Sequence, residues 1–527
     1  MKPSRIILED AVTREPNLGD PDNKLLFTVQ CYYSSVCMPK CNLIPKVKLT
    51  FRLQDPFPED TLGNDLEIVM NTTPFTNSQI VAAFAGKTRK SKARHGEALD
   101  IFPSGIVHDS RHMKPHPIYI DRAQGSRKWD ADGNEYIDYY GGHGSLLLGH
   151  AHPSMVKVVS EQVNQGTHPA ACHDLELKWG QLVKLLIPSA ERVRFTSSGT
   201  EANLMAIRLA RAFTAKNKLM RFKNHFHGWQ DHVAFGSKYA GTENVPGIIN
   251  GILENVIVAD PAEPDRIKHV LETDEDIAAV ILEPTGASSG QIPMARDFVK
   301  MLREVTRAQG IVLIFDEVVT GFRVSAGGAQ ASLGLLPDLT TLAKILAGGL
   351  PGGCVCGRRD IMQLLAFEAA EFHGFQKIPH QGTFNANPMS AGTGVEMLGQ
   401  VAETDISEQA NKLGEKLIST CNQAFSEAMV PWAAYGKGSS VYIFTNPDGI
   451  DIDPLNFRAK DEPIPIMENA GSHSAASLFR LALLVNGVDF NSKPGAIVSA
   501  VHTDEDIAAT GDAVSESLRM LREEGCL

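Results

Sequence analysis

The strongest constraint on the fold is an alternation of helical stretches and short apolar runs that extends from about Asp174 to Gln400. Two of these runs, AAVILEP and IVLIFDEVV, are apolar at consecutive positions rather than at every second position. A strand with this pattern is buried on both faces, which is typical of a parallel sheet covered by helices on both sides. We therefore predict an α/β fold with a mostly parallel sheet, whose ligands bind at the carboxyl ends of the strands.

The segments on either side of this region have other patterns. The stretch PIYIDRAQGSRKWDADGNEYIDY alternates apolar and polar residues around Asp132-Gly133, which predicts a β-hairpin or meander. Helical spacing follows from His152 to Gly166. Towards the end of the chain, a helical segment, the strand-like WAAYGKGSSVYIFT and a helix after Asp504 predict a small α+β lobe.

These patterns divide the 527 residues into four parts. We predict an N-terminal extension of unknown role (1–100), the N-terminal part of a small lobe (101–170), a large domain that binds the ligand (171–400) and a C-terminal small domain (401–527). The extension contains the basic run KTRKSKAR. We interpret this run as a solvated linker, with a nucleic-acid-binding arm as the alternative.

Composition narrows the classes of function. The chain is 43% hydrophobic and 21% charged, as in ordinary globular proteins, and its net charge of -12 disfavours nucleic acids and anionic membranes as partners. Its eight Cys have neither disulfide-framework nor zinc spacing, so we expect no metal. No apolar run has transmembrane length, and the acidic residues near the start are unlike a signal or a mitochondrial presequence. We therefore expect a cytoplasmic protein that does not associate with membranes.

The first candidate site is the segment RFTSSGTEANLMAIRLARAFT, in which a short strand runs through Ser198, Gly199 and Thr200 into a helix. Backbone N–H groups and hydroxyls at a helix N-terminus favour an anion, and a phosphate would fit there. The alternative is an ordinary helix cap, because Ser198 and Glu201 have the spacing of a capping box.

The second candidate is Asp316, which ends the apolar strand in IVLIFDEVVTGFR. A carboxylate there is costly to bury unless it meets a cation or a strong donor, and a protonated pyridine nitrogen would be such a partner. The alternatives are a metal-binding acid and a helix cap. Glu317 should point the opposite way from the same strand and is interpreted as structural.

The third candidate is Lys344, in PDLTTLAKILAGGLPGG. A lysine in a weakly polar surround before a glycine-rich turn can have a lowered pKa, and such an amine can form a Schiff base. The alternative is a surface lysine on a helix. No Gly-Lys-Ser/Thr occurs in this stretch, so a nucleotide-binding Walker loop is disfavoured.

A phosphate cradle, an acid for a ring nitrogen and an imine-forming lysine are together what one ligand requires. From about residue 117 to 502 the chain resembles class III (ω-type) aminotransferases, in particular the branch with glutamate-1-semialdehyde aminomutase and β-amino-acid transaminases. The matching stretches are SSGTEANLMAIRLAR, ILEPTGASSG, IFDEVVTGFR, DLTTLAKILAGGLPGG and HQGTFNANP. The 28-residue separation of Asp316 and Lys344 is also similar to that of this branch.

The resemblance implies a fold type I enzyme that depends on pyridoxal 5′-phosphate (PLP), with residues 171–400 as the PLP-binding domain. Such enzymes are usually homodimers with active sites at the subunit interface. By the resemblance, Lys344 binds PLP as a Schiff base, Asp316 pairs with the pyridine nitrogen and Val318 contacts one ring face. Ser198, Gly199 and Thr200 bind the phosphate, as does Thr383 of the neighbouring subunit.

One position departs from the family pattern. The family has Tyr-His-Gly where this chain reads HFHGW, so Phe226 takes the place of the tyrosine whose ring stacks on the cofactor. Phe226 can still stack, because stacking needs only an aromatic face, but the hydrogen bond of the tyrosine hydroxyl is lost. His227 is interpreted as a structural turn residue, with an approach to the site as the alternative.

For the substrate, the resemblance makes Arg111 the candidate that binds a carboxylate, because a guanidinium suits bidentate capture. The alternative is an exposed loop arginine. Lys493 could replace an arginine of some relatives, and His143, in GGHGSLLLGH, could tune the pocket.

The predicted function is that of an aminotransferase that moves an amino group from an amino acid or amine to a keto or aldehyde acceptor by a ping-pong mechanism. An intramolecular aminomutase is the first alternative. A racemase and a non-catalytic PLP-fold protein are two others.

Overall fold

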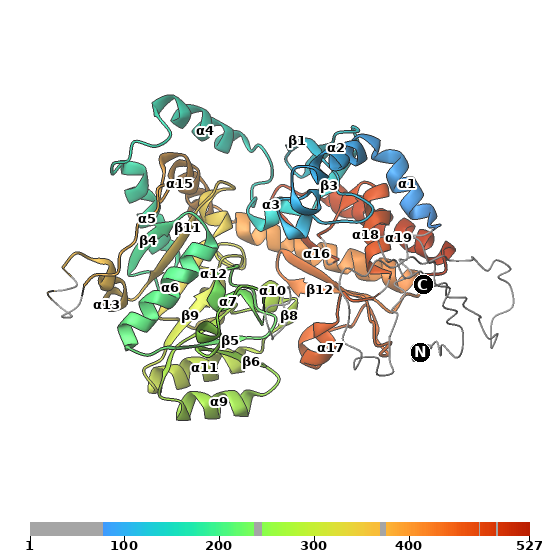
Figure 1. The fold of residues 1–527 in the computed structure, drawn as a ribbon. Helices are drawn as coiled ribbons and strands as arrows, with labels where there is room; N and C mark the ends of the chain where they lie inside the picture. Colours follow the sequence, from blue (N-terminus) through green and yellow to red (C-terminus); the bar gives the residue numbers. More distant parts are fainter. Residues whose placement is uncertain (1–76, 237–244, 369–370, 372–375, 474, 492–493) are drawn as a thin grey trace, which may run out of the picture. The chain divides into compact units, whose positions relative to one another are not determined.

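A seven-stranded sheet with the order β4-β11-β10-β9-β7-β5-β6 forms the centre of the large domain (Figure 1). Its strands are β4 (Arg192–Thr196), β5 (Lys218–Phe222), β6 (Val256–Ala259), β7 (Ile277–Leu282), β9 (Val312–Asp316), β10 (Leu339–Ala343) and β11 (Gly353–Gly357). Neighbouring strands are parallel, except that β11 is antiparallel to both β10 and β4. The prediction of a mostly parallel sheet is confirmed.

The computed structural model describes residues 77–236, 245–368, 371, 376–473, 475–491 and 494–527, which belong to one unit, Thr73–Leu527. Consecutive residues of its central strands pack into different cores. Ile314 joins the core with helix α6 (Gly199–Thr214), whereas Leu313 and Phe315 join the core with α9 (Pro264–Thr273) and α11 (Arg296–Ala308). Both faces of the sheet are therefore buried, which explains why its strands lack polar alternation.

The other helices of the large domain fill its ends and connections. They are α5 (Asp174–Leu186), α7 (Asp231–Ala234), α8 (Asn250–Leu253), α10 (Ala287–Gly290), α12 (Gly328–Leu333), α13 (Arg359–Met362) and α15 (Pro388–Glu403). Helix α15 packs on α5 and on α4 (Pro153–Gln165), the helix expected after His152. The short strand β8 (Ile292–Pro293) follows α10.

The predicted meander is present as β1 (Ile120–Gln124), β2 (Arg127–Asp130) and β3 (Glu135–Asp138), with β14 (Val488–Asp489) parallel to β3. A second sheet contains β12 (Ala433–Lys437), β13 (Ser440–Phe444) and β15 (Gly495–Ile497). The helices of this small lobe include α3 (Gly141–Gly144), α16 (Ile406–Glu427), α17 (Ile464–Glu468), α18 (Ala476–Val485) and α19 (Asp504–Glu523). The lobe thus combines segments from both sides of the large domain.

The interpretation of the basic run KTRKSKAR as a linker is wrong, although its Lys and Arg side chains are exposed to solvent as expected. The run spans the end of α1 (Gln79–Lys87) and the first half of α2 (Arg89–Leu99). The Asp132 carboxylate accepts hydrogen bonds from the backbone N–H groups of Lys90 (2.8 Å) and Ser91 (3.1 Å), which caps the start of α2. Because this cap comes from the meander turn 41 to 42 residues away, the local sequence of α2 contains no sign of it. The domain limits themselves remain predictions.

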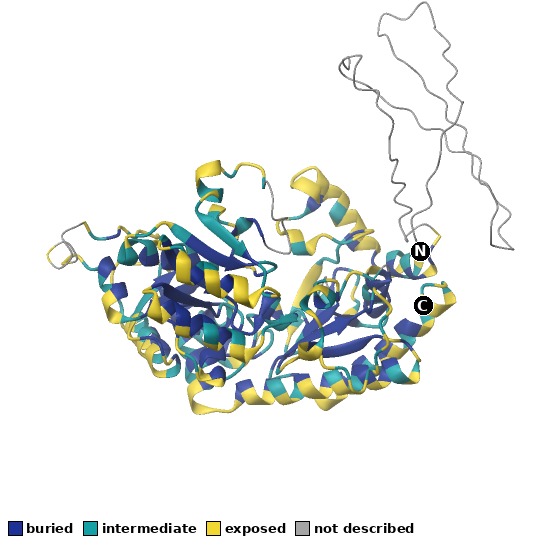
Figure 2. Ribbon diagram, turned by 90° about the horizontal axis from the view of Figure 1, so that it is seen from below, coloured by how far each residue is buried: buried dark blue, intermediate teal, exposed yellow. Residues whose placement is uncertain are grey.

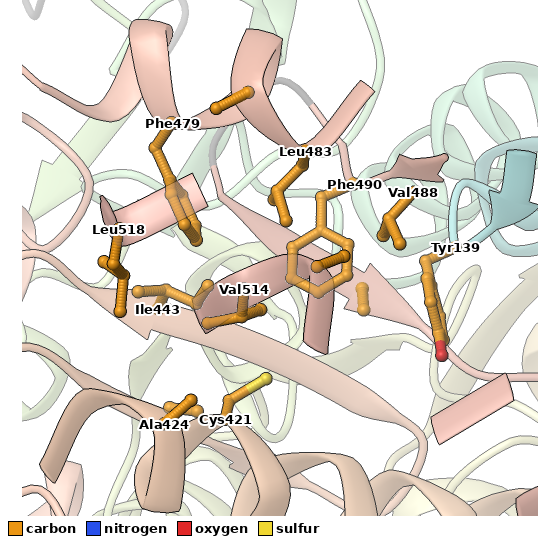
Figure 3. Packing of buried hydrophobic residues seen from close by; sticks show 14 of the residues in the cluster. Tyr139, Cys421, Ala424, Ile443, Phe479, Leu483, Val488, Phe490, Val514 and Leu518 are labelled. Atoms are coloured by element: carbon orange, nitrogen blue, oxygen red, sulfur yellow. The ribbon is translucent and has the colours of Figure 1, made fainter. Parts of the chain in front are cut away.

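Helix α1 contributes to the main core of the small lobe. Ile80 and Phe84 are each 1% exposed and belong to the same apolar cluster as Ile443, Phe479 and Leu518. Figure 3 shows part of this cluster, where side chains of α16, α18 and α19 converge on β13. In Figure 2 the buried residues follow the strands, while the outer helix surfaces are exposed.

Among the helices in the described part of the chain, none combines the length and apolarity that crossing a bilayer requires. The described residues also contain no group of three or more His, Cys, Asp or Glu side chains arranged to hold a metal ion.

The core position of α1 makes a testable prediction. Phe84→Ala should lower the free energy of unfolding by about 3–5 kcal/mol, because a buried phenylalanine leaves a cavity in the small-lobe core. Urea unfolding of the purified protein measures the loss. The matched control is Phe102→Ala, at a 39% exposed phenylalanine, which should cost less than about 1 kcal/mol. Equal losses in the two variants would show that α1 does not stabilise the lobe.

Candidate active site

The ends of β9 and β10 bring two of the predicted site residues together. Thr341 of β10 is paired with Asp316 of β9, and Lys344 comes three residues after Thr341, immediately beyond the strand. The three residues from Thr341 to Lys344 can span at most about 10 Å, so Lys344 lies within that length of chain of the residue paired with Asp316. Lys344 has φ 53°, a left-handed conformation that a residue with a Cβ rarely adopts. A strained lysine at a strand end is a feature of functional sites.

Asp316 is a buried acid surrounded by hydrogen-bond donors. Its Oδ2 accepts from Nδ2 of Asn203 (2.8 Å) and Nδ1 of His227 (2.8 Å), and its Oδ1 accepts from the backbone N–H of Val318 (3.0 Å). The residue is 4% exposed. These donors compensate for the loss of water around the carboxylate. A carboxylate has about four acceptor positions, so about one remains for another donor.

The predicted phosphate cradle lies at the start of α6. Ser198 is the N-cap, and its Oγ accepts from the backbone N–H of Glu201 at 3.2 Å, so the capping interpretation is correct for this side chain. A Cβ on Gly199 would lie 2.8 Å from Cγ2 of Val318, and a Cβ on Gly228 would lie 2.5 Å from Oγ1 of Thr200. The N-terminal turn of α6 therefore contacts the residues that follow Asp316 and His227.

Lys344 has the electrostatic environment of a reactive amine. Burial lowers the pKa of Lys344, and Arg323 acts in the same direction, whereas Asp316 and Glu283 oppose the shift. A lysine with a lowered pKa is more often neutral, and only the neutral amine is a nucleophile.

Glu283 follows β7 and holds the turn that contains Phe226. Its carboxylate accepts from the backbone N–H groups of Phe226 (2.9 Å), Ser288 (3.0 Å) and Ser289 (2.7 Å). Burial raises the pKa of Glu283, and His227 counteracts this shift. Phe226, the residue that departs from the family pattern, is thus held through its backbone.

The substrate candidates Arg111 and His143 are both exposed in the single chain, and Arg111 is near enough to affect the pKa of His143. His143 stacks on His108, with 4.8 Å between the ring centroids, and packs edge-on against Tyr140. Tyr140 donates a hydrogen bond to the carbonyl of Ser110, which holds the short helix η3 (Asp109–Arg111) there. His143 is exposed in the single chain, yet partial burial, together with His108, Arg111 and Lys344, lowers its pKa to about 4.

The other predicted residues are placed differently. Thr383 lies in an exposed turn before α15. Lys493 lies outside the described residues. Glu317 points to the opposite side of β9 from Asp316 and accepts from backbone N–H groups at the start of α12, in agreement with its structural interpretation.

His227 contacts Asp316 directly, so the alternative interpretation, in which His227 approaches the site, is correct. Three further residues near the site were not expected from the sequence. Asn203, Glu283 and Arg323 are buried near the same strand ends. The available signal was a polar residue inside an apolar stretch: NLMAI for Asn203, VILEP for Glu283 and TGFRV for Arg323.

A family model described as aminotransferase class-III matches residues 108–443. The chain belongs to the class III aminotransferase family. The glutamate-1-semialdehyde 2,1-aminomutase of Archaeoglobus fulgidus is 35% identical over 438 residues, which cover 82% of this chain and 100% of the relative. Another protein of that name, from Macrococcus caseolyticus, is 36% identical over 442 residues, with 82% and 99% covered.

Solved structures support the same assignment. An omega-transaminase from Sphaerobacter thermophilus aligns with a TM-score of 0.72 and 29% identity, over 82% of this class III aminotransferase and 98% of that chain. A transaminase with PLP bound aligns with a TM-score of 0.73 and 30% identity, over 83% and 99%. The fold is that of fold type I PLP-dependent transaminases, and PLP is the cofactor.

The candidate site fits this cofactor. Asp316 has remaining acceptor capacity, the helix N-terminus at Gly199 suits a phosphate, and Nε2 of His227 is buried without a partner among the described residues. The residues that could hold PLP are Ser198, Gly199, Thr200, Phe226, Asp316, Val318 and Lys344.

The lowered pKa of Lys344 predicts a pH-dependent change in stability. Since the folded state releases this proton at a lower pH than the unfolded chain, burial of the charged amine should destabilise the fold in full below the lowered pKa and progressively less above it. This cost should disappear as the pH rises towards the ordinary value of 10.5. The free energy of unfolding of the Lys344→Met apoenzyme should therefore exceed that of the wild type at about pH 7, and the difference should shrink up to about pH 11. A difference independent of pH would contradict the shift.

Proposed function

We propose that this class III aminotransferase moves an amino group between an amino acid or amine and a keto or aldehyde acceptor in two half-reactions. The observation that carries the proposal is the placement of Lys344 and Asp316. Asp316 ends β9, and Lys344, whose pKa is lowered, directly follows β10, the strand paired with β9. An amine and a carboxylate so placed suit the two ends of one pyridine ring: the aldehyde carbon and the nitrogen.

Each residue has one proposed task. When bound, PLP supplies an electron sink for negative charge at the substrate carbon. Lys344 holds the aldehyde carbon, gives way to the incoming amine and then moves a proton between two carbon atoms. Asp316 accepts a hydrogen bond from the ring nitrogen and keeps it protonated. Phe226 and Val318 cover the two ring faces.

The anchoring of the cofactor uses the N-terminus of α6. Ser198, Gly199 and Thr200 offer backbone N–H groups and hydroxyls to the phosphate, and the helix dipole favours its charge. In a homodimer, Thr383 of each subunit would bind the phosphate of the cofactor held by the other subunit. The exposure of Thr383 in the single chain is consistent with such a contact. The homodimer and the cytoplasmic location remain predictions.

For the substrate we propose recognition of a carboxylate. Arg111 supplies a guanidinium for bidentate binding, and His143, stacked on His108, borders the same space. Lys493 is a further candidate contact. This contact would favour amino acids over simple amines as substrates.

The comparisons favour one alternative, an intramolecular aminomutase. Relatives with 34–36% identity across nearly their whole length are named glutamate-1-semialdehyde 2,1-aminomutase. Such a reaction uses the same lysine and the same acid but needs no separate acceptor, because the nitrogen returns to the carbon skeleton that supplied it.

Acceptor dependence distinguishes the two reactions. With a panel of α-, β- and ω-amino acids, we expect one keto product for each molecule of pyruvate or 2-oxoglutarate consumed. No sustained turnover is expected when the acceptor is omitted, since a half-reaction leaves the amino group on the cofactor. Chromatography of both products measures the stoichiometry.

The alternatives give other results. Conversion of glutamate-1-semialdehyde into its isomer with the amino group on carbon 1, without any acceptor, would replace the transaminase proposal by the mutase. Inversion of an amino acid without amino transfer would indicate a racemase. Absence of any cofactor-linked absorbance change with the whole panel would indicate a non-catalytic protein.

Substrate recognition is tested with Arg111→Gln. Loss of the bidentate ion pair should raise KM for amino acids about tenfold to a hundredfold and leave kcat less affected. The control substrate is an amine without a carboxylate, such as 1-phenylethylamine, for which KM should not change. An equal effect on both substrates would mean that Arg111 acts on the fold of its loop and not on the carboxylate.

A further inference from the structure

Asn203 connects four parts of the candidate site through one side chain. It lies on α6, one turn after the cradle residues, and is 1% exposed. Its Nδ2 donates to Oδ2 of Asp316 (2.8 Å) and to the backbone carbonyl of His227 (3.0 Å). Its Oδ1 accepts from Oγ1 of Thr341 (2.6 Å).

The contacts require an amide at this position. Asp316 and the carbonyl of His227 only accept hydrogen bonds, whereas the hydroxyl of Thr341 is placed to donate. An asparagine side chain offers two N–H donors and one carbonyl acceptor, so all three partners are served at once. Aspartate lacks the donors, and leucine lacks both functions.

We infer that Asn203 is a positioning residue that fixes the direction of the Asp316 carboxylate relative to the cofactor. It links the acid on β9 to the helix that carries the phosphate cradle, to the strand that leads to Lys344 and to the turn after Phe226. Because its N–H occupies Oδ2 together with His227, the remaining acceptor capacity of Asp316 is on Oδ1, which otherwise accepts only from the N–H of Val318 among the described residues. Oδ1 is therefore the atom offered to the ring nitrogen.

The inference rests on the proposed role of Asp316 and assigns a separate task to a residue that does not touch the cofactor. A purely structural Asn203 would affect stability alone. A positioning Asn203 must also affect how tightly the cofactor binds and how its absorbance depends on pH, because both depend on the direction and charge of the acid under the ring.

The experiment compares Asn203→Leu with Asn422→Leu in the full chain. Asn422 is the matched control: it is also a buried helical asparagine, and its amide bonds to the backbone of Ala434 in the small lobe. Both variants should unfold more easily as apoenzymes. Only Asn203→Leu should raise the dissociation constant for PLP, by about tenfold or more, as loss of a hydrogen bond to a charged group implies. Only this variant should change the pH profile of the cofactor absorbance.

A second variant covers the case in which Asn203→Leu does not fold. Asn203→Asp keeps the shape and the acceptor for Thr341 but places a second carboxylate against Asp316. Two such groups share one negative charge, so the cofactor absorbance should change at a different pH from that of the wild type. A wild-type PLP affinity and pH profile in the folded Asn203 variant, or equal losses in the Asn422→Leu control, would overturn the inference.

Borohydride reduction of the wild-type holoenzyme, followed by peptide mass spectrometry, separates this inference from the proposed function. Trapping of the cofactor on Lys344 supports the site itself. If the wild type is trapped there and the Asn203 variant binds PLP normally, only the role of Asn203 fails. If the wild type carries the cofactor elsewhere, the site and the inference fail together.

Discussion

The candidate site depends on the burial of one negative charge at the end of β9. The apolar residues before Asp316 pack into cores on both faces of the sheet, so the carboxylate has almost no access to water. An ion there is stable only if the protein supplies donors. Asn203, His227 and the N–H of Val318 do so from three segments, and this need brings the helix, the turn and the strand end together.

A second buried charge holds the two lobes around this point. Arg323 is 1% exposed, and burial lowers its pKa to about 10. Its guanidinium donates to three acceptors in the small lobe, namely the carbonyl of Gly144, Oγ of Ser439 and the carbonyl of Val498. A Cβ on Gly144 would lie 3.9 Å from Cδ of Lys344. Arg323 thus fixes the small lobe, with the glycine-rich stretch that contains His143, beside the amine of Lys344. All three acceptors of its hydrogen bonds are uncharged oxygen atoms.

Much of this arrangement was predictable because its signals are local. Consecutive apolar residues indicated the buried strands. Asp316 was visible as an acid that ends such a strand, and Lys344 as a lysine in a weakly polar surround before a glycine-rich turn. The capping of α2 by Asp132 and the choice of Asp316 as the partner of His227 were not predictable, because each contact joins residues far apart in the sequence. A single sequence gives the type of a side chain and its local period but not its partner across the fold. For the same reason Arg323 could be noticed as polar but not recognised as the link between lobes.

Asp316 and Glu317 show how the structure separates a functional acid from a structural one. The two residues are adjacent, both are buried, and they leave β9 on opposite sides. Glu317 accepts four hydrogen bonds, from the N–H groups of Ala329 and Gln330, the Gln330 amide and the Thr320 hydroxyl. These use about all the acceptor positions of a carboxylate. Among the described residues Asp316 accepts three and keeps about one, and burial without saturation is expensive unless a further donor arrives. Of these two adjacent acids, Asp316 is therefore the one with an acceptor position left for a ligand.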